Sequence, residues 1–148
     1  ALFTGPSFPE LAAAVRENLS TRLARHYRGF ATQQRLAWES TGQRSVKKLL
    51  YVLRTLLTGV HALREGELET DLRVLAPRYA LAHAAELIEW KRRGERSELD
   101  DAPAARWAAQ LDGVFTEFDA AERASVLPPE PKHAESLEQL LISLRQRT

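Results

Sequence analysis

The longest run of regularly spaced apolar residues lies between Ser45 and Glu65. When residues are placed about 100° apart, as in an α-helix, its leucines and valines fill one arc of roughly 160°. The members of this arc are Val46, Leu49, Leu50, Val52, Leu53, Leu56, Leu57, Val60 and Leu63. Because the arc is wider than the apolar stripe of a surface helix, the pattern predicts a central helix that is largely buried.

One polar line remains on this predicted helix. It consists of Lys47, Tyr51, Arg54, Thr58 and His61, at spacings of four, three, four and three residues. This repeat stacks side chains on one helical face. A largely buried helix has a single line that faces solvent or a cavity, so the line is either an ordinary solvated face or a binding site.

Apolar spacing and helix-end signals predict further helices on both sides. The expected ranges are residues 8–27, 30–40, 72–76, 78–93, 102–123 and 133–145. Ser7 to Glu10 has the form of a capping box, and Gly66 suits a left-handed C-cap. Gly29 is expected at a kink or at a close approach of another backbone. No stretch alternates with period two, so we expect an all-α fold of five to six helices packed around the central helix at about 45–65.

The length and composition of the chain set limits on its class. A chain of 148 residues suits a single helical domain with a buried core. Cysteine is absent, which excludes disulfides and thiolate metal sites. No apolar run reaches the roughly 18 residues of a membrane span, and no signal peptide is visible, so a cytoplasmic protein with no membrane partner is expected. Methionine is absent even at position 1, which suggests a fragment of a longer protein.

The charge is distributed unevenly along the chain. From Arg16 to Arg64, ten Lys and Arg residues face two acidic residues, a net charge of +8. From Glu65 onward, eleven Lys and Arg residues face seventeen acidic residues, a net charge of −6. A basic first half predicts a partner that carries phosphates, and the second half has the composition of a solvated surface.

Common catalytic and metal-binding motifs are missing. The sequence contains no HExxH, GxxxxGK[ST], GxGxxG, GxSxG or DxD motif, and its four histidines fall on different predicted elements. No metal ligands and no catalytic residues are therefore assigned, and the chain is better suited to binding anions. One alternative uses Arg54 and His61, whose spacing occurs in helical HEPN domains that cleave RNA. There, histidine would act as acid or base and arginine would stabilise the phosphorane charge.

Four segments of the sequence occur in the order and spacing of a known protein family. They are Tyr27–Ala31, Val46–Gly59, Gly66–Leu68 and Lys91–Glu95. Across roughly residues 8 to 95, the sequence resembles the C-terminal region of predicted nucleotidyltransferases of the DNA polymerase β superfamily, the YcgL-like group. The resemblance implies the helical half of a two-domain enzyme, without the upstream catalytic domain that carries the Gly-Ser motif and metal-binding carboxylates. Mg²⁺ and a nucleoside triphosphate are implied for the full-length family, and no cofactor for this chain.

The resemblance and the polar line together predict a nucleotide- or acceptor-binding domain. Arg54 and Lys47 would neutralise the phosphates of a nucleoside triphosphate or a nucleic acid, and Arg28 would join them. Tyr51 would stack on the ligand or form a hydrogen bond to it. Two further candidates are Lys48 and His61. The alternatives are a HEPN-like RNase or antitoxin-type protein and a non-catalytic protein-interaction domain. The sequence leaves the oligomeric state open.

Overall fold

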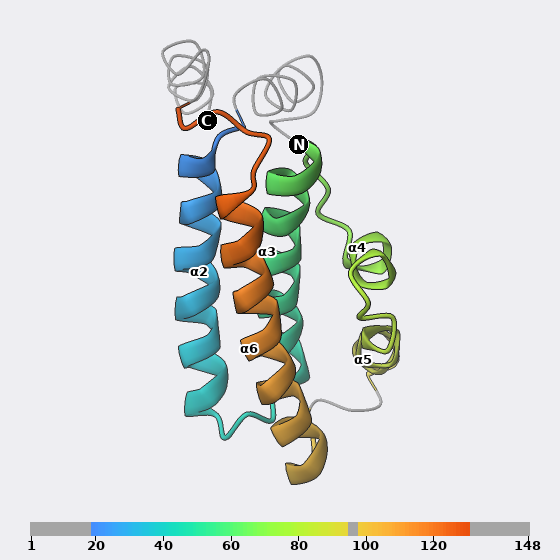
Figure 1. The fold of residues 1–148 in the computed structure, drawn as a ribbon. Helices are drawn as coiled ribbons and strands as arrows, with labels where there is room; N and C mark the ends of the chain where they lie inside the picture. The colour runs from blue at the N-terminus through green and yellow to red at the C-terminus, as the bar shows by residue number, and fades with distance from the viewer. Residues whose placement is uncertain (1–18, 95–97, 131–148) are drawn as a thin grey trace, which may run out of the picture.

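The computed structural model describes residues 19–94 and 98–130. Within these ranges the chain forms five α-helices and no strand, which confirms the all-α prediction (Figure 1). The helices are α2 (Thr21–Ser40), α3 (Val46–Glu65), α4 (Leu72–Arg78), α5 (Ala84–Arg93) and α6 (Asp101–Arg123). None of these helices has the length and apolarity that crossing a membrane requires. The predicted capping box at Ser7 and the predicted helix 133–145 lie outside the described residues.

Helix α3 is the centre of the fold. It contacts each of the other four described helices, and 13 of its 20 residues are buried. All nine members of the predicted apolar arc are among them. The long helices α2, α3 and α6 lie alongside one another, and the short helices α4 and α5 cover the side of α3 away from α2 (Figure 1). The wide apolar arc is therefore explained by partners on several sides of one helix.

Both ends of α3 are capped, and the C-cap is Gly66, as the sequence indicated. The hydroxyl of Ser45 accepts a hydrogen bond from the backbone N–H of Lys48 at 3.2 Å. Gly66 has a φ of 67°, and its N–H donates to the carbonyl of Ala62 at 2.9 Å. Glycine takes this left-handed conformation without the steric cost of a Cβ atom. The predicted helix at 45–65 is thus confirmed to within a residue.

Helix α2 differs from its prediction in two ways. It begins at Thr21, and it continues without a break to Ser40 where two helices had been expected. Gly29 is exposed in the middle of this helix. Apart from the adjoining backbone of α2 itself, no described atom lies within 4 Å of the place where a Cβ atom would be. The prediction of a kink or a close backbone approach at Gly29 is therefore wrong. Its helical neighbours on both sides keep it in an ordinary helical conformation.

The predicted helix 78–93 is also shorter in the structure. Arg78 ends α4, and α5 begins only at Ala84. Between them, Ala80 has a φ of 61°, and the N–H of Leu81 donates to the carbonyl of Ala76 at 2.8 Å. The chain therefore turns sharply after α4. No glycine marks this turn in the sequence. The apolar spacing alone therefore predicted a start for α5 that is too early.

Candidate functional site

A pocket of about 360 Å³ opens between α3, α4 and α5. Its apolar surface comes from Leu50, Leu72 and Ile88. The polar part of the lining is Tyr51 and Arg54 from α3, Thr70 and Asp71 from the preceding loop, Arg73 from α4, and Lys91 from α5. Four consecutive elements therefore meet at one place, and each of the three helices contributes a cation.

Arg54 links α3 to the loop that precedes α4. Its Nε donates a hydrogen bond to the carbonyl of Thr70 at 3.0 Å. Tyr51 lies three residues earlier on α3, which places it on the same face of the helix. The bond to Thr70 fixes the direction of the guanidinium, so Arg54 and Tyr51 form one wall of the pocket.

Tyr51 is flanked by two ammonium groups from different helices. Lys47 Nζ lies 5.8 Å from the centroid of its ring, and Lys91 Nζ lies 5.7 Å from the same centroid. These distances suit cation–π contacts. Tyr51 is 40% exposed, so a ligand can reach it. An exposed aromatic ring with one cation from α3 and one from α5 beside it offers both stacking and positive charge to a nucleotide-like ligand.

Asp71 is the one acidic residue among the described residues that line the pocket. Its Oδ1 accepts a hydrogen bond from Arg73 Nε at 3.1 Å, and its Oδ2 accepts one from Arg73 Nη2 at 3.0 Å. The side-chain and backbone hydrogen bonds from Arg73, with a smaller contribution from the charge of Arg54, lower the pKa of Asp71. The lining thus carries three cations and one ionised carboxylate.

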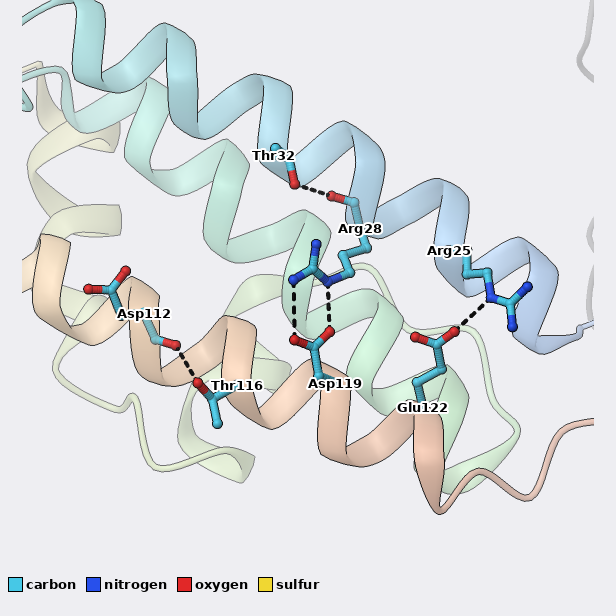
Figure 2. A network of polar contacts seen from close by, with 7 residues as sticks. All are labelled: Arg25, Arg28, Thr32, Asp112, Thr116, Asp119 and Glu122. Atoms are coloured by element: carbon cyan, nitrogen blue, oxygen red, sulfur yellow. Dashed lines mark hydrogen bonds and ion pairs between the residues drawn. The ribbon is translucent and has the colours of Figure 1, made fainter.

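The uneven charge of the sequence is mostly neutralised within the fold. Arginines of the first half pair with acidic residues of the segment 101–130, and Figure 2 shows two of these pairs between α2 and α6. The pairs are Arg22–Glu130, Arg25–Glu122, Arg28–Asp119, Arg35–Asp112, Arg44–Asp101 and Arg64–Glu117. Among the described cations of residues 19–64, those that form no ion pair with a described residue are Lys47, Lys48 and Arg54. All three belong to α3. Of these three, Arg54 lines the pocket, whereas Lys47 does not and instead lies beside the ring of Tyr51.

Arg28 does not lie at the pocket. Its Nε and Nη2 donate to the two carboxylate oxygens of Asp119 at 2.7 and 3.2 Å (Figure 2). Its guanidinium also lies 5.3 Å from the centroid of the Phe115 ring. These contacts place Arg28 between α2 and α6, whereas the pocket is formed by α3, α4 and α5. Lys48 does not line the pocket either.

The polar line on α3 divides after Arg54. Tyr51 and Arg54 are exposed, whereas Thr58 and His61 are buried, with exposed fractions of 3% and 7%. His61 Nδ1 lies 2.7 Å from the hydroxyl of Tyr79. His61 is not among the residues that line the pocket. The structure therefore does not place Arg54 and His61 together in one cavity, as the RNase alternative requires.

Reasoning from the sequence missed Asp71, Arg73 and Lys91. Lys91 falls in one of the segments that carry the family resemblance, and that was the available signal. Arg73 and Asp71 gave no such signal, because their place in the pocket depends on how α4 packs against α3.

The described residues thus form an all-α fold with a cationic pocket beside its central helix. Residues 6–143 match RlaP, the RNA repair pathway DNA polymerase beta family. The chain belongs to this family, which supports the resemblance to polymerase-β-like nucleotidyltransferases. Searches of curated proteins and of solved structures gave no match.

Proposed function

We propose that this chain is the C-terminal helical part of a nucleotidyltransferase, as in the YcgL-like group, and that it holds the nucleotide or the acceptor. The pocket between α3, α4 and α5 would bind their phosphate groups. The observation that carries the proposal is the convergence of Arg54, Arg73 and Lys91, from three separate helices, on one pocket beside Tyr51. In this proposal the chain works in the cytoplasm with an upstream catalytic domain.

The chemistry of the lining suits phosphate. Arg54 forms a hydrogen bond to the described residues only through its Nε atom. Its two terminal nitrogens can therefore donate parallel hydrogen bonds to phosphate oxygens. Lys91 supplies a point charge from α5, with its Nζ 5.7 Å from the centroid of the Tyr51 ring. Leu50 and Ile88 provide apolar surface for a base or a sugar.

The pocket does not fit the Mg²⁺ ion that the resemblance implies for the whole enzyme. Mg²⁺ is held by oxygen ligands, chiefly carboxylates and phosphates. Within residues 19–94 and 98–130, the pocket lining offers three cations and a single carboxylate, Asp71, which Arg73 already engages. Among the described residues, no group of three or more His, Asp or Glu side chains is arranged to hold a metal. We therefore assign the role of this pocket to phosphate recognition and none of the metal chemistry.

The test measures binding to Arg54 variants. The chain is titrated with a nucleoside triphosphate and with a short RNA. Arg54→Ala should weaken binding by about 1–3 kcal/mol, the scale of a charged hydrogen bond, which is about 5- to 150-fold. Arg54→Lys should recover part of the loss, because lysine keeps the charge without the planar fork.

A matched control separates specific binding from a general charge effect. Arg106 is exposed on α6 and does not line the pocket, so Arg106→Ala should leave affinity nearly unchanged. Thermal melts of each variant show whether the fold is intact. Unchanged affinity in a folded Arg54→Ala protein would contradict the proposal.

A further inference from the structure

We propose that the ligand of this site is a single-stranded nucleic acid, and that Lys47 binds a second phosphate of the strand outside the pocket. The strand would pass over the ring of Tyr51, with one phosphate at Arg54 in the pocket and a neighbouring phosphate at Lys47. This inference rests on the proposed function and names the ligand class of the same site, which is an acceptor strand in place of a free nucleotide.

The first observation is the order of residues along the exposed part of α3. Lys47 lies four residues before Tyr51, Arg54 lies three residues after it, and all three are exposed. Both separations are close to one helical turn, so the three side chains share a face. At a rise of about 1.5 Å per residue, Lys47 and Arg54 are roughly 10 Å apart along the helix axis. The aromatic residue therefore has a cation one turn away in each direction.

The second observation is that the cations around this ring are available to a ligand. Lys47, Arg54 and Lys91 form no ion pair with a described residue, whereas the next cation along α5, Arg92, is paired with Glu89 at 2.6 Å. The ammonium groups of the two lysines lie within 5.8 Å of the centroid of the same exposed ring, and Arg54 lines the same pocket as that ring. Three positive charges without an acidic partner thus surround one stacking surface.

This arrangement matches the repeat of a nucleic-acid strand. In a strand, each internal nucleoside has one phosphate on its 5′ side and another on its 3′ side. A base that stacks on Tyr51 therefore brings one phosphate towards Arg54 and the other towards Lys47. The phosphates of a nucleoside triphosphate all extend from one side of the nucleoside, so one of the two cations would bind none. Cations that follow the backbone and aromatic rings that stack on bases together form the binding sites of single strands.

Lys47→Ala tests the second phosphate, and Lys48→Ala is the matched control. Each variant removes one positive charge from the first turn of α3, so their long-range effects on an anion are alike. Lys48 does not line the pocket, and the helix turns it by about 100° from Lys47. The backbone N–H of Lys48, which donates to the hydroxyl of Ser45, is kept in the alanine variant.

Each protein is titrated with ATP and with a short single-stranded RNA that has hydroxyls at both ends. Lys47→Ala should weaken RNA binding by about fivefold, the upper end for an exposed ion pair, and should weaken ATP binding less. The slope of the logarithm of RNA affinity against the logarithm of salt concentration should become shallower by about 0.7, the value for one phosphate contact on a single strand. Lys48→Ala should have the smaller effect on both measurements.

Two variants of Tyr51 test the stacked base. Tyr51→Leu should weaken RNA binding by about 5- to 150-fold, the range for base–aromatic stacking. Tyr51→Phe, which keeps the ring, should retain most of the affinity. Thermal melts of every variant show whether the fold is intact.

The outcomes separate this inference from the proposed function. Equal effects of Lys47→Ala and Lys48→Ala on RNA affinity would overturn the inference, as would an equal loss of ATP and RNA affinity in Lys47→Ala. Binding of ATP without binding of the RNA, or wild-type RNA affinity in a folded Tyr51→Leu protein, would also overturn it. In each of these cases the proposed function stands if Arg54→Ala still weakens binding. Absence of binding to either probe would overturn both.

Discussion

Gly59 of α3 lies directly against the ring of Phe118 on α6. A Cβ atom at position 59 would be 2.3 Å from Cε2 of Phe118, which is closer than real carbon atoms approach. Both residues are buried, and Phe118 is fully inaccessible to solvent. A glycine at this position therefore allows the aromatic ring to pack onto the backbone of the central helix, where α3 and α6 meet (Figure 1).

Gly59→Ala should lower the free energy of unfolding. Overpacking of a well-packed core costs about 1–3 kcal/mol, whereas alanine gains about 1 kcal/mol in helix propensity, so the net effect is destabilising. Gly29→Ala is the matched control, because Gly29 is also within a helix but has no neighbour within 4 Å. It should raise stability by up to about 1 kcal/mol. Urea unfolding of both variants measures the difference, and equal or higher stability of Gly59→Ala would contradict the packing account.

These two glycines show what can be predicted from the sequence. The central helix was predictable because its apolar arc and its caps, Ser45 and Gly66, are local signals. The choice between Gly29 and Gly59 as the site of close approach was not, because it depends on a phenylalanine almost sixty residues away. A glycine within a helical sequence pattern shows that the backbone is conformationally free at that position. It does not show which residue packs against it in the folded protein.

The candidate site was predictable in part for the same reason. Tyr51 and Arg54 share a helical face by spacing alone, and the structure places both in the pocket. Arg73 and Lys91 reach it through the packing of α4 and α5, which no local pattern specifies. Arg28 has the same charge as Arg54, but the acidic residue beside it, Asp119, comes from a helix distant in the sequence. Whether these side chains bind a ligand stays a prediction.

The Arg28–Asp119 pair should contribute to stability and leave ligand binding unaffected. Both side chains are 39% exposed, so solvent screens their attraction. A double-mutant cycle with Arg28→Ala and Asp119→Ala should give a coupling energy of about 0.5–1 kcal/mol, which decreases at high salt. Triphosphate titration of Arg28→Ala should match the wild type. Weaker binding by this variant, with the fold intact, would instead return Arg28 to the binding site.

The protein should lose stability at alkaline pH. Burial raises the pKa of Tyr27 and of Tyr79 above the ordinary value. Between the unfolded and folded pKa values the unfolded chain releases protons that the native state keeps, so stability is present below about pH 10 and decreases as the pH rises further. Tyr27→Phe should remove part of this decrease, whereas Tyr51→Phe, at an exposed position, serves as the control. Urea unfolding at several pH values from neutral to strongly alkaline measures it, and an unchanged slope in Tyr27→Phe would exclude the contribution of Tyr27.

His61 should stabilise the fold through its hydrogen bond with Tyr79. The hydroxyl of Tyr79 and Nδ1 of His61 share a hydrogen bond at 2.7 Å. The carboxylate of Glu67 lies 3.4 Å from Nε2, the other ring nitrogen. Tyr79→Phe leaves Nδ1 without its hydrogen-bond partner, which should lower stability by about 1–3 kcal/mol. Chemical unfolding of the variant measures the loss.

His61→Ala discriminates this structural role from the RNase alternative. His61 is 7% exposed, so removal of its imidazole loses packing as well as the bond to Tyr79, and the free energy of unfolding should decrease by about 2–4 kcal/mol. Triphosphate affinity, measured at a temperature where the variant is folded, should stay near that of the wild type, because His61 does not line the pocket. An RNase that uses His61 as acid or base would behave differently, since the wild type would cleave labelled RNA and His61→Ala would not. We expect both proteins to leave the RNA intact, and cleavage by the wild type that disappears in a folded His61→Ala protein would establish the alternative.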